Sequence, residues 1–187
     1  MLAARFERAS REGEAGLTAS AKALAGLVAS LMHSLSVRAR AGVPEPELMR
    51  WAEAELALVI GKRATNVKAA DAMPYIFGYV NFIDGSARGL PPPGNVFYQM
   101  KSRDTFAPMG PFLVTADEIK NPQKMQITLK VNGIVKQNFN TDDMAHKIPR
   151  CIEWVSSIHT LEPGDILATG TNHRGLFGLQ DGDKVEL

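Results

Sequence analysis

The stretch MQITLKVNGIVKQN, residues 125–138, decides the fold, because apolar and polar side chains alternate on both sides of an Asn-Gly pair. Alternation with a period of two is typical of a strand with one buried face. Asn-Gly between two such runs is the strongest short-range signal for a hairpin turn. The stretch therefore predicts two antiparallel strands, Gln126–Val131 and Ile134–Asn138, joined by a turn at Asn132 and Gly133.

Other short apolar runs, separated by turn residues, flank this hairpin. They predict five more strands: Leu56–Ile60, Tyr79–Ile83, Phe112–Thr115, Ile166–Thr169 and Lys184–Leu187. One helix follows the hairpin, with Thr141 as its cap and Asp142 and Asp143 at its positive end. Pro149 either kinks this helix or marks its true start. Its inward face is predicted to contain Ile148, Ile152, Val155 and Ile158. The fold class is α+β, mainly β.

The first 45 residues differ in composition from the rest. Residues 21–32, AKALAGLVASLM, favour a helix. Apolar residues recur there at helical spacing and form one stripe: Leu24, Leu27, Val28 and Leu31. Pro44 and Pro46 then disfavour helical backbone. We therefore expect an Ala-rich helical N-terminal segment, residues 1–45, followed by one β-rich domain, residues 46–187.

Composition excludes several classes of partner. The chain has 187 residues, and its 45% apolar content is enough for a real core. Its 21 basic and 20 acidic residues give a net charge of +1, so no nucleic-acid or membrane-surface partner is implied. Cys151 is the single cysteine, which excludes a disulfide framework and a thiolate metal cluster. This suits a reducing compartment, and we expect a cytoplasmic protein.

Two acids precede an apolar run in residues 51–62, WAEAELALVIGK. Residues two apart in a strand project from the same face, so Glu53 and Glu55 would lie side by side and repel each other. A third acid, Asp84, follows the predicted strand Tyr79–Ile83. Mg²⁺ or Mn²⁺ favours a site built from a few carboxylates and retained waters. A solvated edge strand is the alternative explanation for the same pattern.

Four motifs follow one another along the chain: E-A-E at residues 53–55, D-G-S-A-R at 84–88, K-S-R-D-T-F-A-P-M-G-P at 101–111 and T-G-T at 169–171. Their order resembles the fumarylacetoacetate hydrolase family over about residues 50–187. The fold of that family's C-terminal catalytic domain, a mixed β-sandwich roll, agrees with the mainly β prediction. The resemblance also implies a homodimer that binds Mg²⁺ or Mn²⁺ and acts on a 2-oxo acid carrying a second carbonyl.

The resemblance implies a role for particular residues. Three acids become metal ligands: Glu53, Glu55 and Asp84. Arg88 and Lys101 would stabilise negative charge on carboxylate or enolate oxygens, and Thr171 would hydrogen-bond the substrate carboxylate. The alternative for both cations is a salt bridge with a nearby acid, such as Asp104 for Lys101.

The chain departs from the family pattern near these motifs. Ile83 stands where the family usually has Asn, and Gly89 where an acid is common. The His and Glu pair of the family's lid helix is not recognisable upstream. His33 does not match it, because Ser36 and not an acid lies three residues later.

The other histidines are candidates for the missing base. His173, directly after the T-G-T motif, is the best of them, since a neutral imidazole can move a proton at ordinary pH. Its alternative is a solvated loop histidine. His146 and His159 are predicted to lie on the helix with structural roles, His159 at its end, where it complements the helix dipole.

Three functional interpretations remain open. The first is a metal-dependent hydrolase that cleaves a C–C bond in a diketo acid resembling acylpyruvate, fumarylpyruvate or fumarylacetoacetate, through a stabilised enolate. The second is an isomerase or decarboxylase of a 2-oxo dicarboxylate, such as 2-hydroxyhepta-2,4-diene-1,7-dioate or oxaloacetate; the missing lid pair favours it slightly. The third is a truncated family member without turnover.

Overall fold

The computed structural model describes residues 49–88, 97–171, 174 and 177–187. The predicted N-terminal segment with its apolar stripe, His33, Gly89 and His173 lie outside these residues. Within the described part of the chain, no helix is long and apolar enough to cross a membrane.

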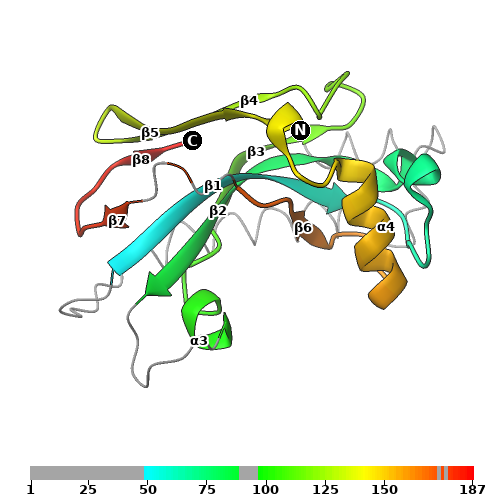
Figure 1. The fold of residues 1–187 in the computed structure, drawn as a ribbon, viewed down its shortest axis with the longest axis horizontal. Coiled ribbons are helices and arrows are strands. Elements are labelled where there is room, and N and C mark those ends of the chain that lie inside the picture. Colours follow the sequence, from blue (N-terminus) through cyan, green and yellow to red (C-terminus); the bar gives the residue numbers. More distant parts are fainter. Residues whose placement is uncertain (1–48, 89–96, 172–173, 175–176) are drawn as a thin grey trace.

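Two antiparallel sheets form the fold (Figure 1). The larger sheet has the order β3-β2-β1-β6, and β7 also pairs with β1. Its strands are β1 (Met49–Ile60), β2 (Ile76–Arg88), β3 (Met109–Thr115), β6 (Ile166–Ala168) and β7 (Gly178–Leu179). The smaller sheet has the order β5-β4-β8 and contains β4 (Gln126–Val131), β5 (Ile134–Asn140) and β8 (Val185–Glu186). The prediction of a mainly β fold is confirmed.

The helices of the described residues are short. Two are α-helices, α3 (Phe97–Lys101) and α4 (Ile148–Ile158). Three are 3₁₀ turns: η1 (Ala69–Asp71), η2 (Met73–Tyr75) and η3 (Thr141–Asp143). α4 packs beside η1 at one end of the larger sheet.

Strand β1 divides the core into two parts, because its side chains alternate between the two faces of the larger sheet. One face packs against β4 and α4 in the main core. This cluster includes Ala52, Ala54, Leu56, Leu58, Ile60, Ile127, Leu129, Ile148 and Ile152. On the opposite face, Ala57 and Val59 pack with Val80 in a smaller cluster. Glu53 and Glu55 belong to this second face by alternation.

The predicted hairpin is confirmed. Val131 of β4 pairs with Ile134 of β5, and the turn residues Asn132 and Gly133 have φ values of 52° and 78°. Two successive positive φ angles are what a type I′ hairpin turn requires, and Asn and Gly adopt them most readily.

All seven predicted strands correspond to strands of the structure, but two of them are much longer than predicted. β1 begins at Met49 and not at Leu56, so the two glutamates lie inside the strand. β2 continues to Arg88, so Asp84 lies within a strand and not at its end. Both differences have one cause: polar residues in a sequence predict the ends of strands, whereas these two strands pair over their whole length.

The predicted helix is wrong at its start. Thr141, Asp142 and Asp143 form the separate turn η3, in which the Asp142 amide donates a hydrogen bond to the Asn140 side chain. α4 begins at Ile148, with Pro149 in its first turn, which is where the missing N–H of proline costs nothing. Ile158 was predicted to face inward, but it is 63% exposed at the end of α4.

Candidate functional site

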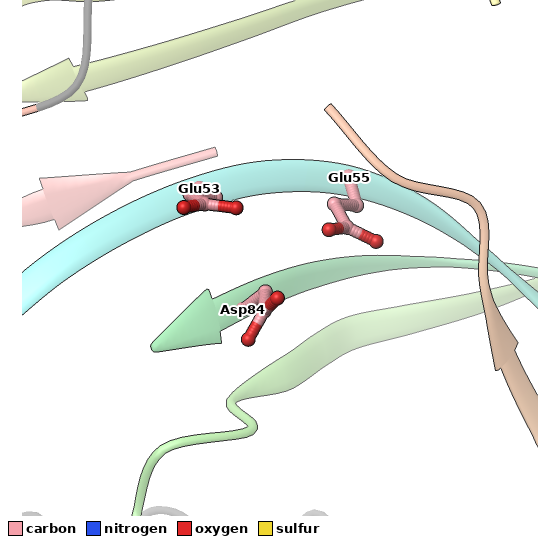
Figure 2. A group of neighbouring side chains, drawn as sticks. All are labelled: Glu53, Glu55 and Asp84. Carbon is pink, nitrogen blue, oxygen red and sulfur yellow. The ribbon is translucent and has the colours of Figure 1, made fainter. Parts of the chain in front are cut away.

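Three acids converge on the face of the larger sheet that lies opposite the main core (Figure 2). Glu53 of β1 is directly opposite Asp84 of β2 in the strand register, and Glu55 projects from the same face two residues later. A carboxylate oxygen of each acid lies within 4.8 Å of those of the other two. Glu53 and Glu55 are each only 3% exposed, so neither side chain is solvated. The alternative of a solvated edge strand is therefore wrong.

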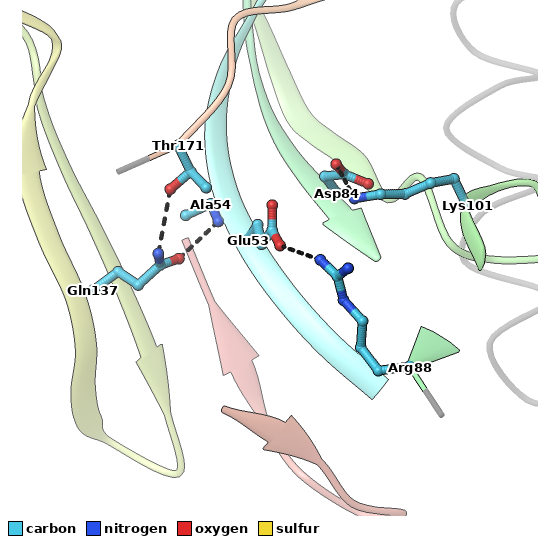
Figure 3. Close-up of polar contacts among 7 residues, drawn as sticks. All are labelled: Glu53, Ala54, Asp84, Arg88, Lys101, Gln137 and Thr171. Carbon is cyan, nitrogen blue, oxygen red and sulfur yellow. Dashed lines mark hydrogen bonds and ion pairs between the residues drawn. The ribbon is translucent and has the colours of Figure 1, made fainter. Parts of the chain in front are cut away.

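Two cations reach these acids from the same side of β1 (Figure 3). The Lys101 ammonium donates a hydrogen bond to the Asp84 carboxylate, and Arg88 Nη2 lies 3.4 Å from Glu53 Oε1. The acid beside Lys101 is thus Asp84, whereas the salt-bridge alternative had named Asp104 as an example. Both cationic side chains remain partly exposed, at 27% for Lys101 and 33% for Arg88. They are therefore accessible to a small anionic ligand at the acids.

The segment after α3 is held against Asp84 by backbone hydrogen bonds. The Ile83 and Gly85 amides donate to the carbonyls of Pro108 and Phe106, at 2.9 and 2.8 Å. A Cβ atom at Gly85 would lie 2.7 Å from the Phe106 oxygen, so this position requires glycine. The approach of the two segments brings Lys101 to the acids. This role of Gly85 could not be predicted from the sequence, because it depends on the contact between two distant segments.

The T-G-T segment fills a gap in the larger sheet. β7 pairs with β1 at residues 50–51 and β6 pairs at residues 57–59, and no strand of the described residues pairs with the edge between them. There the Thr169 hydroxyl donates to the Leu56 carbonyl at 2.5 Å, and the Gly170 amide donates to Glu55 Oε2 at 2.9 Å. The motif thus holds one of the three acids directly.

Gln137 is a site residue that the sequence did not indicate. It comes from β5 of the smaller sheet and is only 2% exposed. Its side-chain oxygen accepts a hydrogen bond from the Ala54 amide at 2.8 Å, and its Nε2 donates to Thr171 Oγ1 at 3.3 Å and to the Arg174 carbonyl at 3.2 Å. Gln137 therefore links β1 to the loop that carries Thr171. In Figure 3, β1 runs between Thr171 and the two cations.

Known proteins resemble this chain in sequence. Residues 20–187 match the family described as fumarylacetoacetate (FAA) hydrolase, C-terminal. The chain belongs to the fumarylacetoacetate hydrolase family. A mitochondrial oxaloacetate tautomerase of Bos taurus is 45% identical over 151 residues, 76% of this chain and 48% of that protein. A maleylpyruvate hydrolase of Aquipseudomonas alcaligenes is 45% identical over 133 residues, 71% of this chain and 45% of that protein. This chain spans about half the length of these relatives.

Solved structures agree with the family assignment. A 2-hydroxyhepta-2,4-diene-1,7-dioate isomerase from Mycobacterium marinum superposes with a TM-score of 0.68 at 39% identity, covering 73% of this chain and 53% of that one. A maleylpyruvate hydrolase from Sphingobium sp. SYK-6, in complex with manganese(II) and pyruvate, has a TM-score of 0.67 at 38% identity and covers 74% of this chain and 49% of that one. The mainly β fold is therefore the fold of this family.

The histidines within the described residues lie on either side of α4. His146 is exposed and precedes α4, so the prediction that it lies on the helix is wrong. His159 is exposed and forms the C-cap of α4.

A cavity of about 630 Å³ lies between the T-G-T segment and α4. Its lining includes Thr171, Trp154, the acid Asp143 and three basic residues, His146, Arg150 and Arg174. Arg150 also pairs with Glu153, its neighbour on α4. The basic residues outnumber the acidic one, so this mainly apolar wall suits a small organic acid.

The electrostatics of the acids fit a divalent cation. The pKa of Glu55 is raised from 4.5 to about 7, first by burial and then by the charges of Asp84 and Glu53. The Gly170 amide and the Lys101 ammonium lower it, but they do not offset these causes. Buried carboxylates that are incompletely neutralised form a hard-oxygen donor set of the kind that Mg²⁺ and Mn²⁺ prefer.

This pKa predicts how the stability of the metal-free protein depends on pH. Unfolded Glu55 loses its proton near pH 4.5, whereas the folded residue keeps it until about pH 7. Between these values the unfolded chain binds fewer protons, so Glu55 lowers the free energy of unfolding as the pH rises, by about 3 kcal/mol in total. Urea denaturation with EDTA at pH 5.5 and pH 8 should show about 2 kcal/mol of this change, the part that falls above pH 5.5. Glu55→Gln, which cannot ionise, should lack this component, and an equal pH dependence in both proteins would contradict it.

Proposed function

We propose that this chain is a divalent-metal-dependent enzyme that cleaves a C–C bond in a diketo acid of the acylpyruvate, fumarylpyruvate or fumarylacetoacetate type. The observation that carries the proposal is the convergence of three carboxylates, two of them buried, with two cations beside them. The hydrolase relatives named above support this choice of reaction.

The three acids fit the cation that the family implies. Glu53, Glu55 and Asp84 offer oxygen ligands only, and their mutual repulsion would be relieved by a positive ion. Either Mg²⁺ or Mn²⁺ suits such ligands. A cation held there would supply Lewis acidity toward the 2-oxo acid end of the substrate.

The residues around the acids divide the remaining tasks. Lys101 and Arg88 would hold the negative oxygens of substrate and enolate, because both are cationic, partly exposed and already beside the acids. Thr171, whose hydroxyl is held by Gln137, would bind the substrate carboxylate. His173, two residues further on, would move the proton.

The alternative is a reaction that needs no activated water: isomerisation, including keto-enol tautomerisation, or decarboxylation of a 2-oxo dicarboxylate. What favours it is that the His and Glu pair of the family's lid helix is not recognisable in the sequence upstream of Glu53. The tautomerase and isomerase among the relatives support this alternative.

A turnover assay separates these possibilities. We expect acylpyruvate or fumarylpyruvate to be hydrolysed in the presence of Mn²⁺ or Mg²⁺ and to remain intact with EDTA. The Glu186→Gln variant, which changes an exposed acid of the smaller sheet, is the control and should turn over substrate like the wild type. Tautomerisation or decarboxylation of oxaloacetate without hydrolysis would favour the alternative, and no turnover of any substrate would contradict the proposal.

We further propose that the chain forms a homodimer, because the apolar stripe that the sequence predicts at Leu24, Leu27, Val28 and Leu31 would need a covering surface. Light scattering at micromolar concentration should give twice the mass of 20.3 kDa. A monomer mass would contradict this expectation.

A further inference from the structure

Ser86 is a fully buried serine whose hydroxyl has no hydrogen-bond partner among the residues that the structure describes. It lies in β2, two residues after Asp84 and two before Arg88. Side chains at this spacing in a strand project from one face, so the hydroxyl is on the face of the acids. A buried hydroxyl that loses its bonds to water and finds no other partner is costly to keep.

The strand register places Ser86 next to the carboxylates. Glu53 is directly opposite Asp84, so Ser86 is its diagonal neighbour on the same face. Diagonal neighbours in an antiparallel pair are about 7–8 Å apart at the backbone, a distance that side chains and one bridging water can span. The hydroxyl is therefore within reach of a ligand held by the acids.

Other buried polar side chains near β1 and α4 have their partners within the protein. Gln137 makes the three hydrogen bonds described above. Ser156 of α4, which is 2% exposed, accepts a hydrogen bond from the Val67 amide at 3.0 Å and lies 3.3 Å from the Glu153 carbonyl, to which it donates. The Ser86 hydroxyl has no such hydrogen bond to the described residues, although Ser86 is at least as deeply buried.

We propose that the Ser86 hydroxyl is satisfied when the acids hold their cation, by hydrogen bonding to a water of the cation's hydration shell. The inference rests on the proposed function, because it requires a divalent-cation site at these acids. Mg²⁺ keeps several waters when a few carboxylates bind it, and these waters need partners in a buried site. Ser86 is thus a positioning residue that acts through the hydration shell and does not touch the substrate.

The test uses the full chain with Ser86→Ala and two measurements: the Kd for Mn²⁺ by calorimetric titration and the Tm with EDTA. We expect Mn²⁺ to bind about tenfold more weakly, the effect typical of losing an outer partner of a metal site. The metal-free Tm should equal that of the wild type or exceed it by about 2–4 °C, because an unsatisfied buried hydroxyl has been removed. A hydroxyl with an ordinary structural role would show the opposite pattern, a lower Tm and an unchanged Kd.

Ser156→Ala is the matched control, because it removes a buried serine hydroxyl whose partners are known. It should lower the metal-free Tm and leave the Kd for Mn²⁺ unchanged. The inference is overturned if the wild type binds Mn²⁺ and Ser86→Ala binds it equally well, or if Ser86→Ala melts as low as Ser156→Ala without metal. Failure of the wild type to bind Mn²⁺ would overturn the proposed function and this inference together.

Discussion

Glu55→Gln is expected to bind Mn²⁺ more than about 100-fold more weakly than the wild type and to lose turnover, while the fold is kept. Even outer partners of a metal site account for 10- to 100-fold in affinity, so the loss of a direct ligand should cost at least the upper end of this range. Loss of the ion's Lewis acidity should then reduce the rate by about 1000-fold or more. Glutamine has nearly the same shape, so the buried position at 3% exposure should still be filled.

The sign of the stability change makes this prediction specific. Without metal at pH 8, Glu55→Gln should be more stable than the wild type, because Glu55 is then ionised against its environment. With saturating Mn²⁺ the order should reverse, since the wild type alone is stabilised by the ion through mass action. Glu186→Gln makes the same chemical change at an exposed position in the smaller sheet and should alter neither property. Unchanged Mn²⁺ affinity in Glu55→Gln would contradict its assignment as a ligand.

Lys101→Met is expected to lower the turnover number by about 100-fold or more, the usual effect of losing one donor that stabilises an oxyanion. Lys101→Met should not weaken Mn²⁺ binding, in contrast to Glu55→Gln. The Lys101 ammonium is hydrogen-bonded to the Asp84 carboxylate, so its removal should leave the Mn²⁺ affinity unchanged or make it slightly tighter. Both side chains are about one-quarter exposed, and the lost ion pair should cost about 1 kcal/mol of stability or less.

Steady-state kinetics at saturating Mn²⁺ and a separate Mn²⁺ titration measure these two effects. Lys184→Met is the matched control, since Lys184 pairs with Glu186 at an exposed position away from the acids. A purely structural Lys101 would show near-full turnover, and this outcome would leave the cation and Arg88 to stabilise the enolate.

The parts of the site that depend on local pattern could be predicted from the sequence. The Asn-Gly turn specifies the hairpin, because few other residues adopt two positive φ angles in succession. The shared face of Glu53 and Glu55 follows from the alternation of any strand. The meeting of Asp84 with Glu53 was implied by the family resemblance, since sequence alone does not give the register between two strands.

The parts that depend on long-range register could not be predicted. Gln137 faces inward because the pairing of β4 with β5 shifts between Leu129 and Lys130, and a shift of one residue exchanges the two faces of a strand. The T-G-T segment meets Glu55 because β6 and β7 leave part of the β1 edge uncovered. The short α3 and β7, of five and two residues, lack enough length for any periodicity.

The most direct test of the metal centre is a crystal structure of the full chain grown with Mn²⁺, with anomalous data collected at the manganese absorption edge. We expect one strong anomalous peak between the carboxylate oxygens of Glu53, Glu55 and Asp84, with the Lys101 ammonium displaced from Asp84. Absence of a peak between these three acids at millimolar Mn²⁺, with Lys101 still bound to Asp84, would contradict it.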